Sequence, residues 1–367
     1  MKLFIYKLDE LTKLCSSFPE VVPEMRMFDC FLNNIQKYYE IVDIFEECDV
    51  AFLPIDFTKL IYVSPHHKYS TVPPKCPARP NPHSLIQKRD HIKYFWDMFV
   101  DPYTKNQLKL KPHFILYSYV LYEIDFYHIP KEVIIAAYET EVSHQNDINT
   151  SKVNHDMIMI PYILNEDRLN STRIIPKLYF DDLPEDIISN MKSIDVGFFG
   201  PISDDSRKIL TQSRSFLKHL NPTGYTYFSG DATTVNKNIY KIRYLFVLRG
   251  DTYTRRSFYQ SFAYWCVPII YATDATKYQK VMPDGIDVKD VCLILPDNDK
   301  TDDCEYAEIV NKILITELKN EENYLNKIKL FSDVFRAFNY FEANCCPPPF
   351  KAIIDKVYTT RTSYEIP

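Results

Sequence analysis

The sequence predicts an α/β fold made of two Rossmann-like domains. In the second half of the chain, five short apolar runs alternate with helix-like stretches, a pattern typical of a doubly wound parallel sheet. The first half shows the same alternation less regularly. At 367 residues and 46% hydrophobic residues, the chain is long enough for two cores. We expect domains at 1–188 and 189–336, with a tail at 337–367 that crosses back to the first domain.

Apolar runs and helical periodicity place the elements of the first half. We expect strands at Lys2–Tyr6, Val50–Pro54, Phe114–Val120, Glu132–Ala137 and Met157–Pro161, and helices at Met25–Tyr39 and Leu85–Phe99. The proline-rich segment Ser64–Pro82 has no periodicity and predicts a long loop. A role in acceptor binding and a simple surface connection are equally compatible with it.

The second half contains all six glycines of the chain, between Gly197 and Gly285, so tight turns and close backbone approach to a ligand are concentrated there. We expect strands at Val196–Phe199, Tyr225–Ser229, Tyr244–Leu248, Val267–Ala272 and Val291–Leu295, and helices at Asp205–Leu217, Arg255–Trp265 and Ala307–Leu318. Ligands bind such sheets beyond the carboxyl ends of the strands, where Gly200 and Gly230 fall.

The segment Leu245–Tyr271 predicts a strand, a glycine-containing turn, a helix and a second strand. Thr252 or Thr254 is in position to cap the helix, whose first-turn N–H groups carry the positive end of its dipole. Arg255 and Arg256 stand at this end, whereas arginines favour the other end of a helix. The arrangement predicts a binding site for an anionic group such as a phosphate. The alternative is an arginine pair that is merely solvated.

Charge and composition exclude several other classes of protein. A net charge of −6 and a pI near 5.9 argue against a dedicated nucleic-acid-binding protein. Nine cysteines without a Cys-x-x-Cys motif indicate reduced thiols. The apolar run that opens the chain is too short for a signal peptide or a transmembrane segment. We therefore expect a cytoplasmic protein.

The helix-opening segment resembles the signature of the exostosin-like glycosyltransferases, and most closely that of the plant xyloglucan galactosyltransferase subgroup. The matching positions are Gly250, Asp251, Thr252, Thr254, Arg255, Arg256, Ser257, Ser261, Cys266, Val267 and Pro268. Two positions depart from the pattern: Gln260 stands where the family has an acidic residue, and Trp265 where it has a small one, most often glycine.

Weaker matches to the same family pattern follow in order along the chain. They are Lys2–Tyr6, Cys48–Pro54, His113-Phe114, Asp156–Tyr162 and Asp195–Pro201. The resemblance implies the GT-B architecture, in which two Rossmann-like domains face each other across a cleft. It also implies that the C-terminal half binds a nucleotide-sugar donor, and that the N-terminal half brings the acceptor and a general base.

The resemblance thus implies an inverting glycosyltransferase that moves a sugar from a nucleotide-sugar donor, expected to be a UDP-sugar, to a hydroxyl of an oligosaccharide or glycoprotein acceptor. The expected donor-binding and phosphate-binding residues are Arg249, Gly250, Asp251, Thr254, Arg255, Arg256, Ser257, Gln260 and Gly200. Because arginines and a helix N-terminus can stabilise the departing diphosphate, we expect no metal and no other cofactor.

The general base is less well defined. His113 is the first candidate through the family match, and Glu139 and Glu141, which follow an expected strand, form a second one together with His144. Asp125, His66 and His67 are further options. A structural histidine and a solvated charged loop are the corresponding alternatives.

Two other kinds of protein stay open. A catalytically degenerate relative that binds carbohydrate or acts as a scaffold would share the fold and would account for Gln260 and Trp265. A phosphatase or nucleotide-processing enzyme would use the same anion site, but would require a nucleophile or a metal cluster that the sequence does not suggest.

Overall fold

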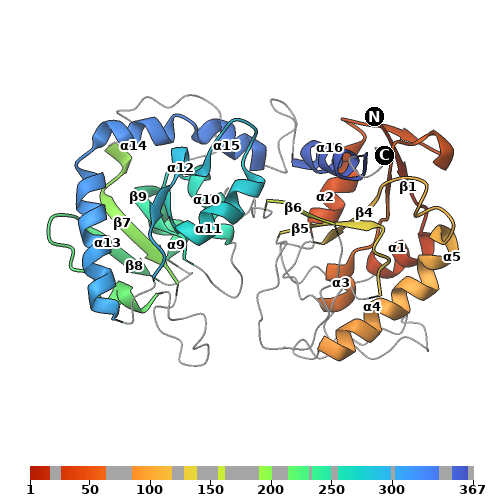
Figure 1. Cartoon of the computed structure of the whole chain (residues 1–367), viewed down its shortest axis with the longest axis horizontal. Coiled ribbons are helices and arrows are strands. Elements are labelled where there is room, and N and C mark those ends of the chain that lie inside the picture. The colour runs from red at the N-terminus through yellow and green to blue at the C-terminus, as the bar shows by residue number, and fades with distance from the viewer. Residues whose placement is uncertain are drawn as a thin grey trace. The chain divides into compact units, whose positions relative to one another are not determined.

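The computed structural model describes residues 1–16, 26–62, 85–117, 128–138, 156–161, 190–200, 214–230, 234–248, 255–298, 302–338 and 349–362. The chain divides into two compact units, of which the first comprises Met1–Ile163 and Tyr340–Pro367, and the second Leu164–Asn339. Both are α/β units with a parallel sheet, so the fold class expected from the sequence is confirmed (Figure 1).

Within its described residues, the first unit holds a six-stranded sheet in the order β2-β1-β3-β4-β5-β6. The strands are β1 (Lys2–Ile5), β2 (Glu40–Val42), β3 (Val50–Phe52), β4 (His113–Tyr117), β5 (Val133–Ala137) and β6 (Met157–Met159). The helices are α1 (Asp9–Ser16), α2 (Arg26–Ile35), η2 (Phe45–Glu47), α3 (Phe57–Tyr62), α4 (Leu85–Phe99), α5 (Asp101–Thr104) and α16 (Pro349–Thr362). The C-terminal helix α16 contacts α2, β3 and β6.

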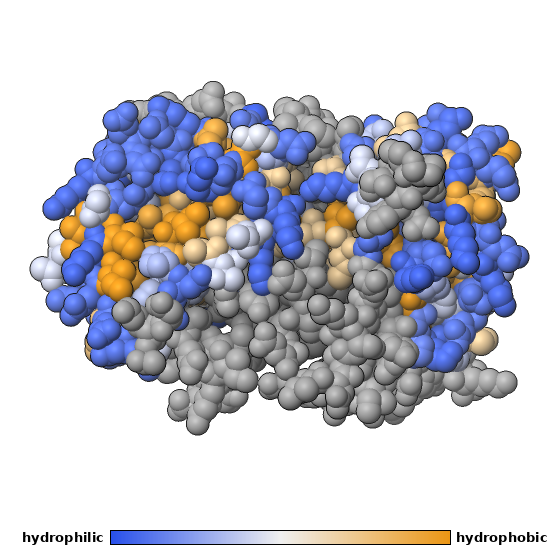
Figure 2. All heavy atoms as spheres, viewed as in Figure 1, coloured by the Kyte–Doolittle hydropathy of each residue, from blue (hydrophilic) through white to orange (hydrophobic). Residues whose placement is uncertain are grey.

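The second unit, over its described residues, holds a five-stranded parallel sheet in the order β11-β10-β9-β7-β8. The strands are β7 (Ile194–Phe199), β8 (Tyr227–Gly230), β9 (Ile242–Phe246), β10 (Val267–Tyr271) and β11 (Leu293–Leu295). The helices are η5 (Ser215–His219), α9 (Val235–Asn238), η6 (Ile239–Lys241), α10 (Arg256–Ala263), α11 (Ala272–Tyr278), η7 (Gln279–Val281), α12 (Val288–Val291), α13 (Asp303–Leu318), α14 (Glu321–Ile328) and α15 (Phe331–Phe338). On the face that Figure 2 shows, hydrophilic residues gather over α14, whereas hydrophobic residues gather toward the middle of this unit.

Each sheet has one topological switch point. In the second unit the chain passes from β7 outward to β8, returns to pair β9 with the other side of β7, and continues in that direction through β10 to β11. In the first unit the corresponding point lies between β1 and β3. Parallel sheets bind ligands in the crevice beyond the carboxyl ends of the strands at such a point. The fold therefore marks one candidate region in each unit.

Several expected elements differ from the structure. The short edge strand β2 was not expected, because only one of its three residues is buried. Of the expected helix Asp205–Leu217, residues 205–213 lie outside the described part of the chain, and the next turn is the 3₁₀ helix η5 rather than α-helix. The expected loop Ser64–Pro82 also lies outside the described residues.

Candidate functional site

The switch point of the second unit lies between the carboxyl ends of β7 and β9. Phe198 is paired with Phe246, so Gly200, two residues on, comes level with Leu248 at the edge of the sheet. Val247 and Leu248 are buried and continue the line of β9 toward Arg249 in the sequence. Two expected donor-site residues, Gly200 after β7 and Arg249 after β9, therefore follow neighbouring strands in the chain.

Gly200 has a backbone conformation that other residues adopt only with strain, with φ at 146°. Its N–H donates a hydrogen bond to the carbonyl of Gly230 at 2.9 Å, which ties the ends of β7 and β8 together. A Cβ atom at this position would lie 3.3 Å from the Phe198 ring and 3.8 Å from Nη1 of Arg214. Glycine thus keeps the backbone accessible at the switch point.

Helix α10 begins at Arg256, and its N-cap is Arg255 rather than one of the expected threonines. The backbone N–H of Arg255 donates to the Tyr278 hydroxyl at 3.0 Å, whereas the Arg255 side chain makes no capping hydrogen bond. Arginine has no acceptor atom, so it cannot satisfy first-turn N–H groups as serine or threonine would. The helix start is therefore fixed by a tertiary contact, and its positive end is not neutralised by an N-cap side chain.

Arg256 and Ser257 lie in the first turn of α10 and are half-buried. Burial lowers the pKa of the Arg256 guanidinium, because desolvation disfavours its charged form. An arginine nevertheless stays protonated, so the protein holds a partly desolvated cation next to a helix N-terminus. An anion is the ligand that this combination binds best.

Gln260 lies one turn beyond Arg256, and only 8% of its surface is exposed. Residues four apart share a helix face, so its amide lies on the same face of α10 as Arg256. Its burial is compatible with a donor contact and equally with a packing role. Because residue 260 is buried, a charged side chain at this position would lose its hydration, which costs free energy on folding.

Aromatic packing fixes the orientation of α10. Phe258 stacks on Tyr278 with ring centroids 3.7 Å apart, and Phe262 packs edge-on against Phe331 of α15 at 5.0 Å. All four rings are buried. Contacts with Tyr278 and with Phe331 of α15 therefore fix the orientation of α10 and of its first turn.

The remaining expected donor residues, Arg249, Gly250, Asp251 and Thr254, lie outside the described residues. Their place in the chain, between the end of β9 and the start of α10, is the connection that crosses the switch point. Their role in donor binding stays a prediction.

The structure places His113 away from any expected ligand region. It is the first residue of β4, at the amino end of the strand, and it is fully buried. Its Nε2 lies 2.8 Å from the Tyr6 hydroxyl, and its Nδ1 lies 2.8 Å from the carbonyl oxygen of Lys111. Both ring nitrogens are thus engaged in fixing the fold, which favours the structural role.

Glu139 and Glu141 follow Tyr138 in the sequence and lie outside the described residues. Tyr138 is buried directly after β5, at the carboxyl edge of the sheet, which is the edge where parallel sheets bind ligands. In the sequence, Glu139 and Glu141 thus follow the carboxyl end of β5, whereas His113 lies at the amino end of β4.

Among the residues that the structure describes, no group of three or more histidine, cysteine, aspartate or glutamate side chains is arranged to hold a metal ion. The sequence has one Asp-x-Asp triplet, Asp297–Asp299, after the edge strand β11. Asp297 accepts hydrogen bonds from the backbone N–H of Thr273, at 3.2 Å, and from its hydroxyl, and so caps α11.

Arg214 is not among the site residues expected from the sequence, and the structure brings it to the switch point of the second sheet. Its guanidinium packs against Gly200 and over the Phe198 ring, 5.8 Å from the ring centroid. Only 6% of the residue is exposed. In the sequence, an arginine flanked by serines cannot be distinguished from an exposed arginine. Only the fold shows that Arg214 is buried next to Gly200.

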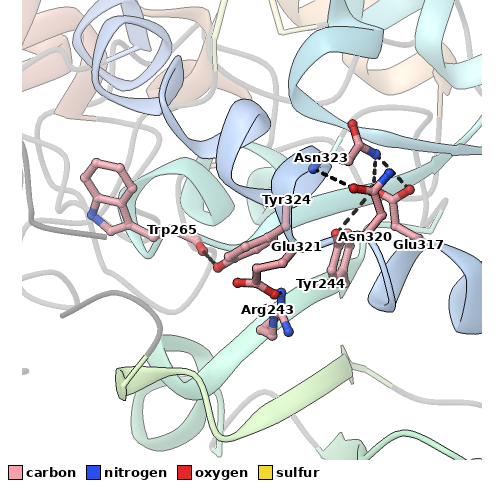
Figure 3. Close-up of polar contacts among 8 residues, drawn as sticks. All are labelled: Arg243, Tyr244, Trp265, Glu317, Asn320, Glu321, Asn323 and Tyr324. Atoms are coloured by element: carbon pink, nitrogen blue, oxygen red, sulfur yellow. Dashed lines mark hydrogen bonds and ion pairs between the residues drawn. The ribbon is translucent and has the colours of Figure 1, made fainter. Parts of the chain in front are cut away.

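The amino end of the same sheet has a different character (Figure 3). Arg243, next to the start of β9, lies over the Tyr324 ring at 4.4 Å and forms an ion pair with Glu321. Glu317 accepts hydrogen bonds from the Tyr244 hydroxyl at 3.2 Å and from the Asn323 amide at 2.7 Å. These polar groups connect β9 to α13 and α14, and they satisfy one another within the fold.

No helix among the described residues is long and apolar enough to cross a membrane. No protein-family model matches the chain, and no curated protein matches it.

Several solved structures are similar to the chain over nearly its whole length. WaaG, a glycosyltransferase involved in lipopolysaccharide biosynthesis, is 10% identical over 92% of this chain and 97% of its own, with a TM-score of 0.41. HepE from Anabaena in complex with UDP is 8% identical over 98% of this chain and 99% of its own, with a TM-score of 0.41. Sucrose-phosphate synthase from Thermosynechococcus elongatus is 9% identical over 99% of each chain, with a TM-score of 0.40. Similarity at this level assigns neither a family nor an activity to the chain.

Proposed function

We propose that the protein is an inverting glycosyltransferase that uses a nucleotide-sugar donor, with UDP as the leaving nucleotide. The observation that carries the proposal is the position of α10: it starts on Arg255 and Arg256, directly after the connection that leaves β9 at the switch point of the second sheet. The resemblance of residues 249–268 to the exostosin-like signature supports the same assignment.

Transfer of the sugar separates the anomeric carbon from the β-phosphate of the donor, so negative charge develops on the diphosphate. The first turn of α10 and the two arginines are suited to stabilise that charge. Loss of one such electrostatic contact typically lowers kcat by about 10²- to 10³-fold. The reaction in this form requires no metal ion.

The acceptor hydroxyl must lose a proton as it attacks the anomeric carbon. We assign this step to Glu139 or Glu141, because they follow the carboxyl end of β5, in preference to the buried His113. The acceptor is a hydroxyl of an oligosaccharide or a glycoprotein. Replacing each glutamate by glutamine separately distinguishes the two, since the base variant loses turnover and keeps donor binding.

Thermal unfolding with and without UDP tests the proposal. A ligand that binds only the folded protein stabilises it, by about 2.7 kcal/mol at a concentration 100 times its dissociation constant. We expect UDP to raise the Tm of the parent, and Arg256→Ala to abolish the shift. Lys93→Ala, on the exposed surface of α4 in the first unit, is the control and should respond like the parent. Identical shifts for parent and Arg256→Ala would place the phosphate site elsewhere.

The departure at Gln260 favours one second candidate, a degenerate relative that has kept the fold and lost catalysis. That protein would bind UDP weakly and transfer no sugar. Product formation from a radiolabelled UDP-sugar by the parent protein would exclude it.

A further inference from the structure

Arg214 is a buried cation at the switch point of the second sheet, on the opposite side from the arginines of α10. It is the N-cap residue of η5, and its guanidinium reaches back to Gly200 at the end of β7. Gly200 comes level with Leu248 of the neighbouring strand line, directly before Arg249. Arg214 therefore flanks the crevice from the β7 side, whereas Arg255 and Arg256 approach from the β9 side.

The packing around η5 fixes the position of Arg214. Phe216, two residues on, is buried against Phe246 of β9 and Tyr306 of α13, with ring centroids 6.0 and 5.0 Å away. The carbonyl of Arg214 accepts a hydrogen bond from the N–H of Leu217 at 3.0 Å. The backbone at Arg214 is thus anchored to the same strand that leads to the donor-site turn.

A guanidinium is costly to bury, and it stays charged at any pH at which the protein is folded. The guanidinium carbon lies over the Phe198 ring, 5.8 Å from its centroid. The forked N–H groups of a guanidinium match the oxygens of a phosphate with two parallel hydrogen bonds. The neighbouring Gly200, which lacks a Cβ and has a left-handed backbone, lets a ligand approach closely at the same place.

We infer that Arg214 is a third phosphate-binding residue, which holds the diphosphate of the nucleotide from the β7 side of the crevice. The inference rests on the proposed function, and it adds a residue that lies outside the exostosin-like segment. A diphosphate carries oxygens on two phosphorus atoms, so cations on both sides of the switch point bind it better than the α10 arginines alone.

Isothermal titration of UDP into the full chain tests this inference, with Arg214→Gln and Arg214→Lys as variants. A hydrogen bond to a charged group is typically worth a factor of about 10 to 100 in affinity. We expect Arg214→Gln to weaken UDP binding by that factor. Arg214→Lys keeps the charge and loses the fork, so we expect a smaller loss of about 3- to 10-fold.

Arg243→Gln is the matched control, because Arg243 is also a partly buried, ring-stacked arginine of this unit but belongs to the amino end of the sheet. It should lower the Tm and leave the affinity for UDP unchanged. If Arg214→Gln does not fold, Arg214→Lys carries the test alone. Parental affinity in Arg214→Lys and in a folded Arg214→Gln overturns the inference. A parent that binds neither UDP nor GDP overturns the proposed function instead, so the two failures are distinguishable.

Discussion

At the scale of single residues, Asp56 is a buried carboxylate in an energetically unfavourable setting. Only 3% of it is exposed, and burial raises its pKa to about 7. Its Oδ1 accepts a hydrogen bond from the backbone N–H of Lys59, and the groups that face it are the Lys59 ammonium, Asp29 of α2 and Cys15 of α1. Its charged form is therefore less favourable in the folded than in the unfolded protein.

We predict that Asp56→Asn changes the pH dependence of stability. A carboxyl whose pKa is raised on folding contributes stability below its unfolded pKa, near 4, and loses it as the pH rises through 7. The parent should therefore lose up to about 4 kcal/mol between pH 4 and 8 relative to the variant, since three pKa units correspond to that energy. Asparagine retains the cap hydrogen bond to Lys59.

Urea unfolding at several pH values measures this difference. Asp56→Ala serves as the control: it removes the carboxylate and the cap together, so it should follow the pH trend of Asp56→Asn with about 1 kcal/mol less stability throughout. Parallel stability curves for the parent and Asp56→Asn would show that Asp56 does not titrate in this range.

Gln260 is the residue of helix α10 where the chain departs from the exostosin-like pattern. We predict that Gln260→Asp changes donor affinity or donor choice by about 1 kcal/mol, because a carboxylate accepts hydrogen bonds from sugar hydroxyls more strongly than an amide does. The burial of this side chain predicts a lower Tm as well. Titration with UDP-glucose and UDP-galactose measures the first effect. A variant with unchanged affinity for both sugars would mean that residue 260 does not face the donor.

At the scale of elements, the end of α10 explains why the family pattern has a small residue where this chain has Trp265. Cys266 N–H donates to the Ser261 carbonyl at 2.9 Å, and Trp265 N–H donates to the Phe262 carbonyl at 3.3 Å, which is a Schellman motif. Trp265 occupies its left-handed position with φ at 56°. Glycine is the residue that adopts this conformation without strain.

We predict that Trp265→Gly is more stable than Trp265→Ala by about 1 kcal/mol, because alanine keeps the left-handed strain and glycine relieves it. Both variants lose the stacking on Phe331, whose ring centroid lies 6.3 Å from that of Trp265. The difference between their free energies of unfolding therefore measures the cost of the left-handed backbone at residue 265. Urea unfolding gives the two free energies. At an ordinary helical position alanine is the more stable residue, and the same order here would contradict the strained backbone.

The elements that the sequence predicted best are the strands whose two faces are both buried. Strand β10 and the part of β9 from Tyr244 onward are continuous apolar and buried runs, so their residues alone identify them. The N-cap of α10 was wrongly expected at Thr252 or Thr254, because the backbone N–H of Arg255 is held by the hydroxyl of Tyr278, which lies 23 residues away in the chain. Arg214 was missed for the same reason: its position depends on contacts with Gly200 and on the packing of η5.

At the scale of the whole molecule, two parallel sheets give the chain two separate topological switch points, and Arg214 and the first turn of α10 bring cations to that of the second sheet. The net charge of −6 makes this local positive site the exception on an acidic protein. A glycosyltransferase needs such a division, since the donor is an anion and the acceptor is a neutral hydroxyl.

We predict that the proposed sugar transfer requires no divalent metal ion. If Arg255, Arg256 and the first turn of α10 neutralise the departing diphosphate, turnover of a UDP-sugar should be unchanged after dialysis against EDTA. Addition of Mn²⁺ or Mg²⁺ should then raise the rate less than about twofold, because no step of the reaction depends on a divalent cation. Loss of turnover in EDTA with recovery on Mn²⁺ would contradict this mechanism. Asp251 and Asp297 would then be the first ligands to test, by replacing each with asparagine, and Asp251 is the nearer in sequence to the arginines of α10.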